Sequence, residues 1–438
     1  MIRAAIAPAL NSRLALAGGF ACAVLACRPV NEASPETPPA SQTIDTPHFA
    51  WPQWGGPRRD FHLPDIVLSP DWPPDGPPIV WTRPLGDGYS AIVSDDERLF
   101  TMYREAEEEV VVALSRENGA TLWMHRYAAP IDFGDHPQGY GWGPRSTPLV
   151  LGDRLYAAGF NGVMHCLDRR DGRVIWRRDL IRDYAGTVNR WGYACSPLAW
   201  NDTIIMLVGG KGRSVVALDA RDGRLRWGRH DFANSYASGK LIEAGGRVHL
   251  VCFMAREVVG LDPDNGARLW SHAHENQWLN NISDPVWGEG SLLFLSSEGD
   301  GGARVIELRA SGPQITAGEL WATRKVRISH RNAIRIGDFI YCTSGDFGPA
   351  FFTAVNVRDG TFAWRHRGYK ESCLLALGDK LLVLDEDGWL SLATATPESL
   401  TIHARARLLE REAWTVPTVI GRRVYLRDRK TARAIELP

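Results

Sequence analysis

The chain has 438 residues, of which 44% are hydrophobic, so it is long enough to bury a substantial core. Its 50 basic and 51 acidic residues leave a formal net charge of −1, without the basic surplus that nucleic-acid-binding domains carry. We therefore expect no nucleic-acid partner. Seventeen Trp, 43 Gly and 27 Pro, without a long apolar periodic helix, are typical of an all-β, turn-rich protein.

The first 50 residues are expected to lie outside the fold. Arg3 and Arg13 supply a positive region, and an apolar stretch too short to span a bilayer runs from Leu14 to Ala26. It ends in Val24-Leu25-Ala26-Cys27, which looks like a bacterial lipoprotein signal whose cysteine becomes lipidated. An ordinary signal peptide with an incidental cysteine is the alternative. Residues 1–26 are therefore interpreted as a signal peptide.

Residues 27–50 are rich in Pro, Ser, Thr and Glu, a composition that buries little apolar area, and we interpret them as a disordered tether. With Cys27 as the lipid anchor, the protein is expected to be exported and held at a membrane. No Asp follows Cys27. This favours the outer membrane, with the protein facing the periplasm.

A unit that combines Asn-Gly or Asp-Gly with a Trp four residues later recurs along the remaining chain. The Gly adopts positive φ at low cost, as a tight hairpin requires, and an Asp or Asn upstream accepts backbone N–H bonds in the turn. The Trp then falls on the outer strand, where its indole buries a large area against the next unit. The repeat tryptophans are Trp81, Trp123, Trp176, Trp227, Trp270, Trp321 and Trp364.

From Trp123 onward these tryptophans are 43 to 53 residues apart, a period typical of solenoids and propellers, and β patterning around each copy favours a propeller. One unit reads as four strands, over 146–153, 154–160, 163–168 and 173–179. Eight inner strands are expected to begin near Ser90, Ser146, Cys195, Ala237, Ile282, Arg331, Ser372 and Thr415.

The unit that begins at Thr415 has only about three strands, and the segment around Trp81 supplies a fourth. The sequence therefore predicts an eight-bladed β-propeller over 51–438, with four-stranded antiparallel blades and the N-terminal strand completing the C-terminal blade. Seven blades is the alternative, because residues 393–409 lack the Gly-x-x-x-Trp ending.

The Ala/Cys-Leu-Asp-x-x-Asp-Gly-x-x-x-Trp unit resembles the repeat of pyrroloquinoline-quinone (PQQ) propellers, a family of quinoprotein alcohol dehydrogenases and an outer-membrane assembly lipoprotein. The opening residues 51–60 are similar to the start of secreted PQQ-like propellers of uncharacterised role. The dehydrogenases carry adjacent cysteines over the cofactor and hold Ca²⁺ with a Glu, an Asn and an Asp. This chain has no Cys-Cys and no Cys-x-x-Cys-His, and that calcium set cannot be placed on it.

In a propeller, the loops that lead into the inner strands gather at one mouth of the central channel. Two of these loops, 127–145 and 180–195, are long. Aromatic faces with a few cations suit an anionic, planar or carbohydrate-like ligand, although the same residues could simply plug the channel. The residues expected at the mouth are Tyr89, Arg145, Trp191, Tyr236, Asn281, Arg331, Lys370 and Trp414.

Smaller features are interpreted as structural. Five cysteines have apolar, strand-like flanks and are expected to be buried thiols, with one disulfide as the alternative: Cys166, Cys195, Cys252, Cys342 and Cys373. The acidic run 105–109 is expected to be a solvated hairpin tip, and the Gly-rich run 209–213 another. No metal site and no catalytic set is predicted.

Two functional hypotheses remain. The first is a monomeric, non-catalytic binding or scaffold module that presents its mouth to an envelope protein or to a small anionic or glycan ligand, with no cofactor. The second is a PQQ-dependent oxidoreductase that binds its quinone with calcium. Trp191, Arg145 and Lys370 would then be the contacts. The missing cysteine pair and calcium set favour the first.

Overall fold

The computed structural model describes residues 50–63, 66, 68–131, 138–345, 349–410 and 412–438. The chain divides into two units, Met1–Gln42 and Thr43–Pro438. The signal peptide, Cys27, all of the tether but Ala50, and residues 132–137 of the first long loop lie outside the described residues. No described helix is long and apolar enough to cross a membrane.

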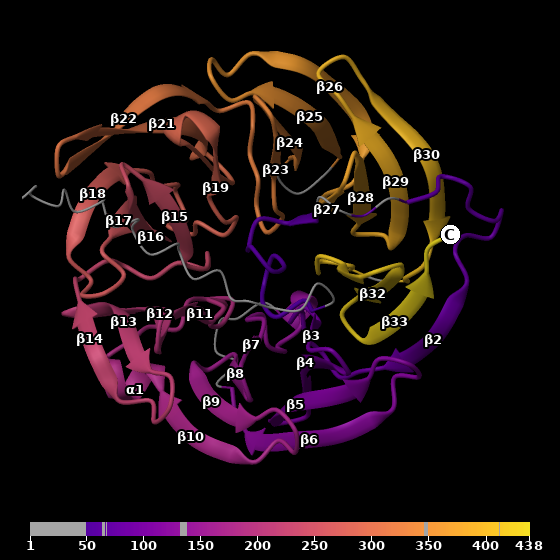
Figure 1. The fold of residues 1–438 in the computed structure, drawn as a ribbon, viewed down its shortest axis with the longest axis horizontal. Helices are drawn as coiled ribbons and strands as arrows, with labels where there is room; N and C mark the ends of the chain where they lie inside the picture. Colours follow the sequence, from indigo (N-terminus) through magenta and orange to yellow (C-terminus); the bar gives the residue numbers. More distant parts are fainter. Residues whose placement is uncertain (1–49, 64–65, 67, 132–137, 346–348, 411) are drawn as a thin grey trace, which may run out of the picture. The chain divides into compact units, whose positions relative to one another are not determined.

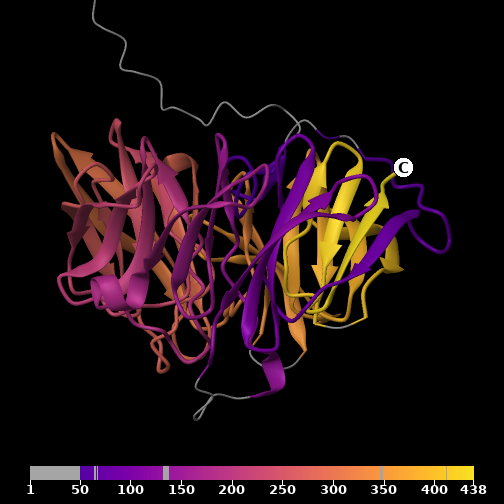
Figure 2. The ribbon, with the colours of Figure 1, turned by 90° about the horizontal axis from the view of Figure 1, so that it is seen from below.

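Residues 79–436 form eight four-stranded antiparallel sheets arranged as a ring, so the predicted eight-bladed propeller is confirmed (Figure 1). Figure 2 shows the ring from the side, with the strands running between its two faces. Blades 1 and 2 are β3 (Val93–Ser94), β4 (Arg98–Glu105), β5 (Glu108–Ser115) and β6 (Thr121–Ala128), then β7 (Leu149–Leu151), β8 (Arg154–Ala158), β9 (Val163–Asp168) and β10 (Val174–Asp179). Blades 3 and 4 are β11 (Leu198–Trp200), β12 (Thr203–Gly210), β13 (Arg213–Asp219) and β14 (Leu225–Arg229), then β15 (Lys240–Ala244), β16 (Arg247–Phe253), β17 (Glu257–Leu261) and β18 (Arg268–Ala273).

The second half of the ring repeats this pattern. Blades 5 and 6 are β19 (Val286–Gly288), β20 (Leu292–Ser297), β21 (Gly302–Ser311) and β22 (Gln314–Thr323), then β23 (Ile334–Ile336), β24 (Phe339–Ser344), β25 (Ala350–Asn356) and β26 (Phe362–Tyr369). Blades 7 and 8 are β27 (Ser372–Leu377), β28 (Lys380–Asp385), β29 (Trp389–Ala395) and β30 (Leu400–Arg407), then β31 (Thr418–Ile420), β32 (Arg423–Arg427) and β33 (Thr431–Glu436) with β2 (Ile79–Pro84). Short helices α1 (Leu180–Tyr184), η1 (Gln138–Tyr140) and η2 (Glu289–Ser291) lie in the connections.

The ring closes within blade 8, as the sequence predicts. Strand β2, from the N-terminal end, pairs antiparallel with β33, and Trp81 lies opposite Ala434. Closure of this kind leaves no blade at an open end of the array. The sequence did not predict β1 (His62–Leu63), which pairs in parallel with β27 and adds a fifth strand to the inner edge of blade 7.

The repeat tryptophans hold neighbouring blades together. Each outer strand has a bulge at the same register position, and in seven blades a Trp directly follows the bulged residue, for example Trp123 opposite Ala113. In six seams the indole N–H donates to a turn carbonyl of the next blade: Trp81 to Arg116, Trp123 to Arg169, Trp176 to Ala220, Trp227 to Pro263, Trp321 to Val357 and Trp364 to Thr396.

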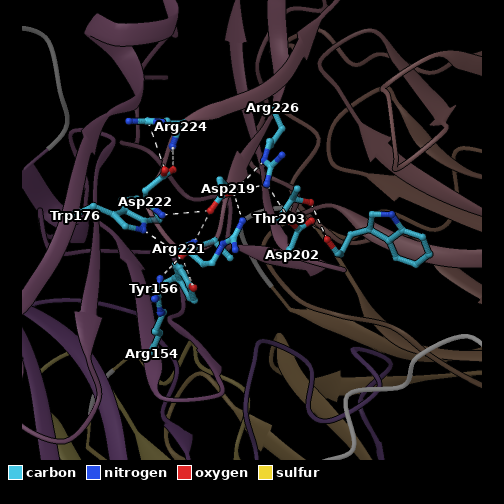
Figure 3. Close-up of polar contacts among 12 residues, drawn as sticks. Arg154, Tyr156, Trp176, Asp202, Thr203, Asp219, Arg221, Asp222, Arg224 and Arg226 are labelled. Carbon is cyan, nitrogen blue, oxygen red and sulfur yellow. Dashed lines mark hydrogen bonds and ion pairs between the residues drawn. The ribbon is translucent and has the colours of Figure 1, made fainter.

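The seam between blades 2 and 3 shows how the turn makes this contact (Figure 3). Asp219 accepts from the backbone N–H of Arg221 at 2.8 Å and pairs with Arg226, which fixes the turn. The Ala220 carbonyl then receives Trp176, Tyr156 and Arg154 from blade 2, at 2.8–3.1 Å. Burial alone raises the pKa of Asp219, but the Arg221 and Arg226 bonds lower it to about 2.

Two seams depart from the pattern for identifiable reasons. In blade 4, Trp270 donates to Nδ1 of His249 in its own blade, because the β21–β22 hairpin of blade 5 is expanded and lacks the repeat turn. In blade 7, Ala404 occupies the Trp position opposite Leu392. A Trp at this position would have no turn carbonyl to bond, because the third and outer strands of the next blade, blade 8, come from opposite ends of the chain and no hairpin turn joins them.

Two smaller predictions have different outcomes. The five cysteines are free and buried, as expected. The acidic run is a hairpin tip only in part, because Glu109 is fully buried while the other glutamates are exposed. Its carboxylate accepts from Tyr127 Oη at 2.6 Å and from the backbone N–H of Phe160 at 2.9 Å. The alternation of side chains along β5 turns Glu109 into the seam with blade 2.

Candidate functional site

The N-terminal residues 50–63 bond to blades 1, 3 and 5. In Figure 1 this indigo segment lies at the centre of the ring. Trp51 bonds to Ser94 of blade 1 at 2.8 and 3.0 Å, and the guanidinium of Arg59 donates to carbonyls of blade 3 at 3.0 and 3.2 Å. Trp54 Nε1 donates to Asp284, before blade 5, at 2.7 Å. Sequence reasoning marked these residues only as a characteristic opening and missed this role.

A cavity of about 460 Å³ lies at the mouth, and loops before the inner strands of all eight blades line it. The segment 50–63 contributes Trp54 and Phe61 to its wall. The structure therefore brings most of the sequence-predicted mouth residues into one cavity. The predicted residues that line it are Tyr89, Arg145, Trp191, Tyr236, Arg331 and Trp414.

Two of the eight predicted mouth residues lie elsewhere. Asn281 is fully buried, and its side-chain amide donates to the Met254 carbonyl at 2.6 Å. Its own carbonyl accepts from Tyr236, so it joins blades 4 and 5. The half-exposed Lys370 lies beside the cavity, with its ammonium 3.7 Å from Asp387 and 4.0 Å from Glu386.

Aromatic rings form one wall of the cavity. Tyr89 stacks on Trp414 at 4.9 Å, and Tyr140 meets Trp191 edge-on at 5.4 Å and 83°. The Arg145 guanidinium lies 5.1 Å from the Tyr89 ring and donates to the Trp191 carbonyl at 2.6 Å. Burial lowers the pKa of Arg145 and raises that of Tyr236 to about 12. Tyr140 was not selected from the sequence, although the run 139–143 signalled an aromatic, Gly-rich loop tip.

A buried arginine faces two carboxylates across gaps too long for hydrogen bonds. The Arg331 side chain is 0% exposed, and its nitrogens lie 3.7 Å from Glu371 and 3.6 Å from Glu386. None of its three nitrogens has a hydrogen-bonding N or O partner among the described residues, and Nε1 of Trp414 is likewise unpaired. Burial, with the positive charges of Arg331 and Arg145, lowers the pKa of His330 and favours a neutral imidazole.

Carboxylates outnumber cations in the cavity. From the sequence, only aromatic side chains and a few cations were expected there. Two of them are held by hydrogen bonds: Asp284 by Trp54 and the backbone of Ser238, and Glu298 by Asn280 and Ser329. Burial raises the pKa of Asp284. The four carboxylates are Asp284, Glu298, Glu371 and Glu386, against the two cations Arg145 and Arg331.

This charge pattern does not fit PQQ, which is a tricarboxylate. Its carboxylates would lie among four others with two guanidinium groups to compensate them. Among the described residues, no three His, Cys, Asp or Glu side chains are grouped to hold a metal ion.

Comparison with known proteins identifies relatives of two kinds. A family model described as outer membrane protein assembly factor BamB matches residues 107–366, more than half of the chain. The chain is 30% identical over 140 residues to BamB of Kangiella koreensis, covering 32% of this chain and 31% of that protein. It is 28% identical over 144 residues to a quinohemoprotein alcohol dehydrogenase of Pseudomonas putida, covering 29% of this chain and 19% of that protein. The chain thus spans less than a third of either relative.

Solved structures support the fold alone. BamB from Moraxella catarrhalis superposes with a TM-score of 0.55 at 15% identity, covering 81% of this chain and 98% of that one. A europium-containing methanol dehydrogenase gives 0.64 at 10% identity, covering 87% and 90%. An assembly factor and a dehydrogenase therefore share this architecture, and function must be argued from the site.

Proposed function

The chain belongs to the family of the outer membrane protein assembly factor BamB, and on that premise we propose that it is a non-catalytic binding propeller of the bacterial envelope. It acts as a monomeric scaffold whose mouth receives a ligand or an envelope protein partner. The observation that carries the proposal is the mouth cavity, to which residues 50–63 contribute Trp54 and Phe61 and which loops of every blade line. A cavity with buried donors that lack hydrogen-bond partners among the described residues supports a binding role.

The alternative is a quinoprotein oxidoreductase, which the likeness to the Pseudomonas putida enzyme favours. The two proposals differ in whether the protein binds PQQ and reduces a dye with it. We expect no saturable binding when the purified protein is titrated with PQQ, with and without Ca²⁺, by calorimetry and tryptophan fluorescence, and no PQQ-dependent dye reduction with alcohols. One-to-one binding that Trp191→Ala abolishes, together with dye reduction, would establish the enzyme instead.

The scaffold proposal also has a readout in cells. If the protein assists outer-membrane protein assembly, as its family description suggests, deleting its gene should lower the amount of β-barrel proteins in purified outer membranes. Supplying the native gene should restore them. Unchanged levels in the deletion strain would contradict a role in assembly, while leaving ligand binding at the mouth to be judged by titration.

Envelope attachment is part of the proposal. Residues 1–26 are the signal peptide, Cys27 carries the lipid, and residues 27–50 connect it to the propeller at the outer membrane, facing the periplasm. We expect metabolic palmitate labelling of the native protein and recovery in the outer-membrane fraction. Cys27→Ser should abolish the labelling. A native protein that takes up no label would contradict the lipid anchor.

A further inference from the structure

The mouth cavity contains buried donors that have no hydrogen-bonding N or O partner in the part of the chain that the structure describes. All three Arg331 nitrogens are buried without a hydrogen-bonding N or O partner among the described residues, and so is the indole N–H of Trp414, whose ring lies 5.4 Å from the guanidinium. Buried donors are almost always satisfied, and leaving a charged one unpaired is costly. A ligand in this cavity therefore has to accept hydrogen bonds at Arg331.

The same ligand has to donate hydrogen bonds, because carboxylates flank the guanidinium. The Glu386 carboxylate, 26% exposed, lies 3.6 Å from Arg331, and Glu371 lies 3.7 Å away on another nitrogen. A carboxylate ligand only accepts and would meet both glutamates, whereas an ammonium only donates and would meet Arg331. A hydroxyl both donates and accepts. Neighbouring hydroxyls can bridge an arginine and a glutamate.

Aromatic rings in the same cavity offer an apolar surface to the ligand. Tyr140 and Trp191 form a corner at 83°, and Tyr140 is 38% exposed. A pyranose ring has apolar C–H faces and hydroxyls around its edge. It can therefore lie on an aromatic ring while its edge reaches the polar groups. The cavity of about 460 Å³ is in the usual range for a small-molecule site.

A second hollow extends the cavity outward. Glu386 also lines an open groove of about 750 Å³ along the seam of blades 7 and 8, which carries Ala404 in place of the repeat Trp. The groove presents acidic and guanidinium groups together, the same mixture that flanks Arg331. Its charged lining residues are Glu386, Asp387, Arg407, Glu410, Glu412 and Arg433. A ligand that fills both hollows is a chain of several polar units.

From these observations we propose that the mouth cavity and the adjoining groove bind an oligosaccharide without acidic groups, a ligand class that rests on the proposed binding function. One sugar ring occupies the cavity between the Tyr140–Trp191 corner and Arg331, and further units follow the groove past Glu386. The sugar hydroxyls provide the hydrogen bonds that the guanidinium lacks.

The test is calorimetric titration of the purified protein with four neutral tetrasaccharides: cellotetraose, maltotetraose, mannotetraose and chitotetraose. PQQ and tetra-alanine serve as the tricarboxylate and peptide comparisons. We expect saturable one-to-one binding of at least one tetrasaccharide, and at least tenfold weaker binding of the corresponding monosaccharide because the groove is then unused. Failure of all four tetrasaccharides to bind would overturn the saccharide assignment.

Two variants locate the site. Arg331→Met should weaken tetrasaccharide binding at least tenfold, and so should Tyr140→Ala, which removes an exposed ring and leaves the buried packing intact. The matched control is the exposed pair of Arg256 and Glu275, 2.8 Å apart and outside both hollows. Arg256→Met should bind like the native protein. Native affinity in Tyr140→Ala would place the ligand elsewhere and overturn the proposal.

The comparison ligands separate failure of this inference from failure of the proposed function. Binding of tetra-alanine without any tetrasaccharide overturns the saccharide and keeps a binding module whose ligand is a peptide. Binding of PQQ with Ca²⁺-dependent dye reduction overturns both.

Discussion

Tryptophan and arginine side chains occur both in the seams between blades and at the mouth of the channel, but their hydrogen bonding differs between the two places. In a docked seam such as that of blades 2 and 3, the Trp176 indole is buried and its N–H meets the Ala220 carbonyl at 3.1 Å. At the mouth, the buried indole N–H of Trp414 has no hydrogen-bond partner among the described residues, and neither has the guanidinium of Arg331, whose flanking carboxylates are 3.6 and 3.7 Å away. Satisfied polar groups fix one structure, whereas unsatisfied ones leave bonding capacity for a ligand.

The largest effect should come from breaking a docked seam. Trp176→Ala removes an indole that is 6% exposed and packs on the turn at Gly223, so it leaves a large cavity and takes one of three donors from the Ala220 carbonyl. We expect the free energy of unfolding to fall by about 3–5 kcal/mol. Urea denaturation measures it. Trp389→Ala, at a Trp that is 36% exposed, is the control and should cost far less.

A second prediction concerns the loss of stability in acid that comes from His165, in the seam between blades 1 and 2. Burial, with the charges of His125 and Arg177, lowers the pKa of His165 to about 3, from an unfolded value near 6.5. The unfolded chain therefore binds a proton that the folded chain excludes, so stability is full above pH 6.5 and falls as the pH drops toward 3. His165→Leu should remove roughly 2–3 kcal/mol of this loss between pH 7 and pH 4.

Urea denaturation of native protein and variant at each pH measures the difference. The exposed His403→Leu is the control and should follow the native curve. A His165→Leu curve parallel to the native one would show that this imidazole does not sense acid. Glu109 in the same seam acts in the opposite direction, because burial raises its pKa and its contribution is lost as the pH rises.

The same comparison explains what sequence could predict. A tryptophan on an outer strand and a glycine at positive φ recur, so repetition alone gave the blades and the closure through Trp81. The mouth loops do not recur, and only their residue types were visible. Glu298 reaches the cavity from the β20–β21 hairpin, and Trp54 reaches it from the N-terminal segment. Neither position follows from repeat spacing, because each depends on where a non-repeating segment crosses the ring.

A third prediction concerns the glycine under a docked indole. Gly223 has φ +69°, and a Cβ there would lie 2.7 Å from the Trp176 ring. Gly223→Ala should lower the free energy of unfolding by about 2–3 kcal/mol, from left-handed strain plus the clash. Gly212 has φ +71° at a hairpin tip with nothing within 4 Å, so Gly212→Ala should lose only the strain, about 1 kcal/mol. Equal losses in the two variants would mean that the Trp176 ring can move away from the added Cβ at little cost.

The smallest effect gives the sharpest comparison. Trp176→Phe keeps an aromatic ring but leaves the Ala220 carbonyl without its indole donor, so we expect a loss of about 1 kcal/mol in the free energy of unfolding. Trp414→Phe removes an N–H that has no hydrogen-bond partner among the residues the structure describes, so its loss should stay within about 0.5 kcal/mol. Urea denaturation of both variants in the absence of added ligand measures the pair. A loss at Trp414 as large as that at Trp176 would mean that the mouth indole is already satisfied, and the contrast between closed seams and an open mouth would fail at the residue where it is clearest.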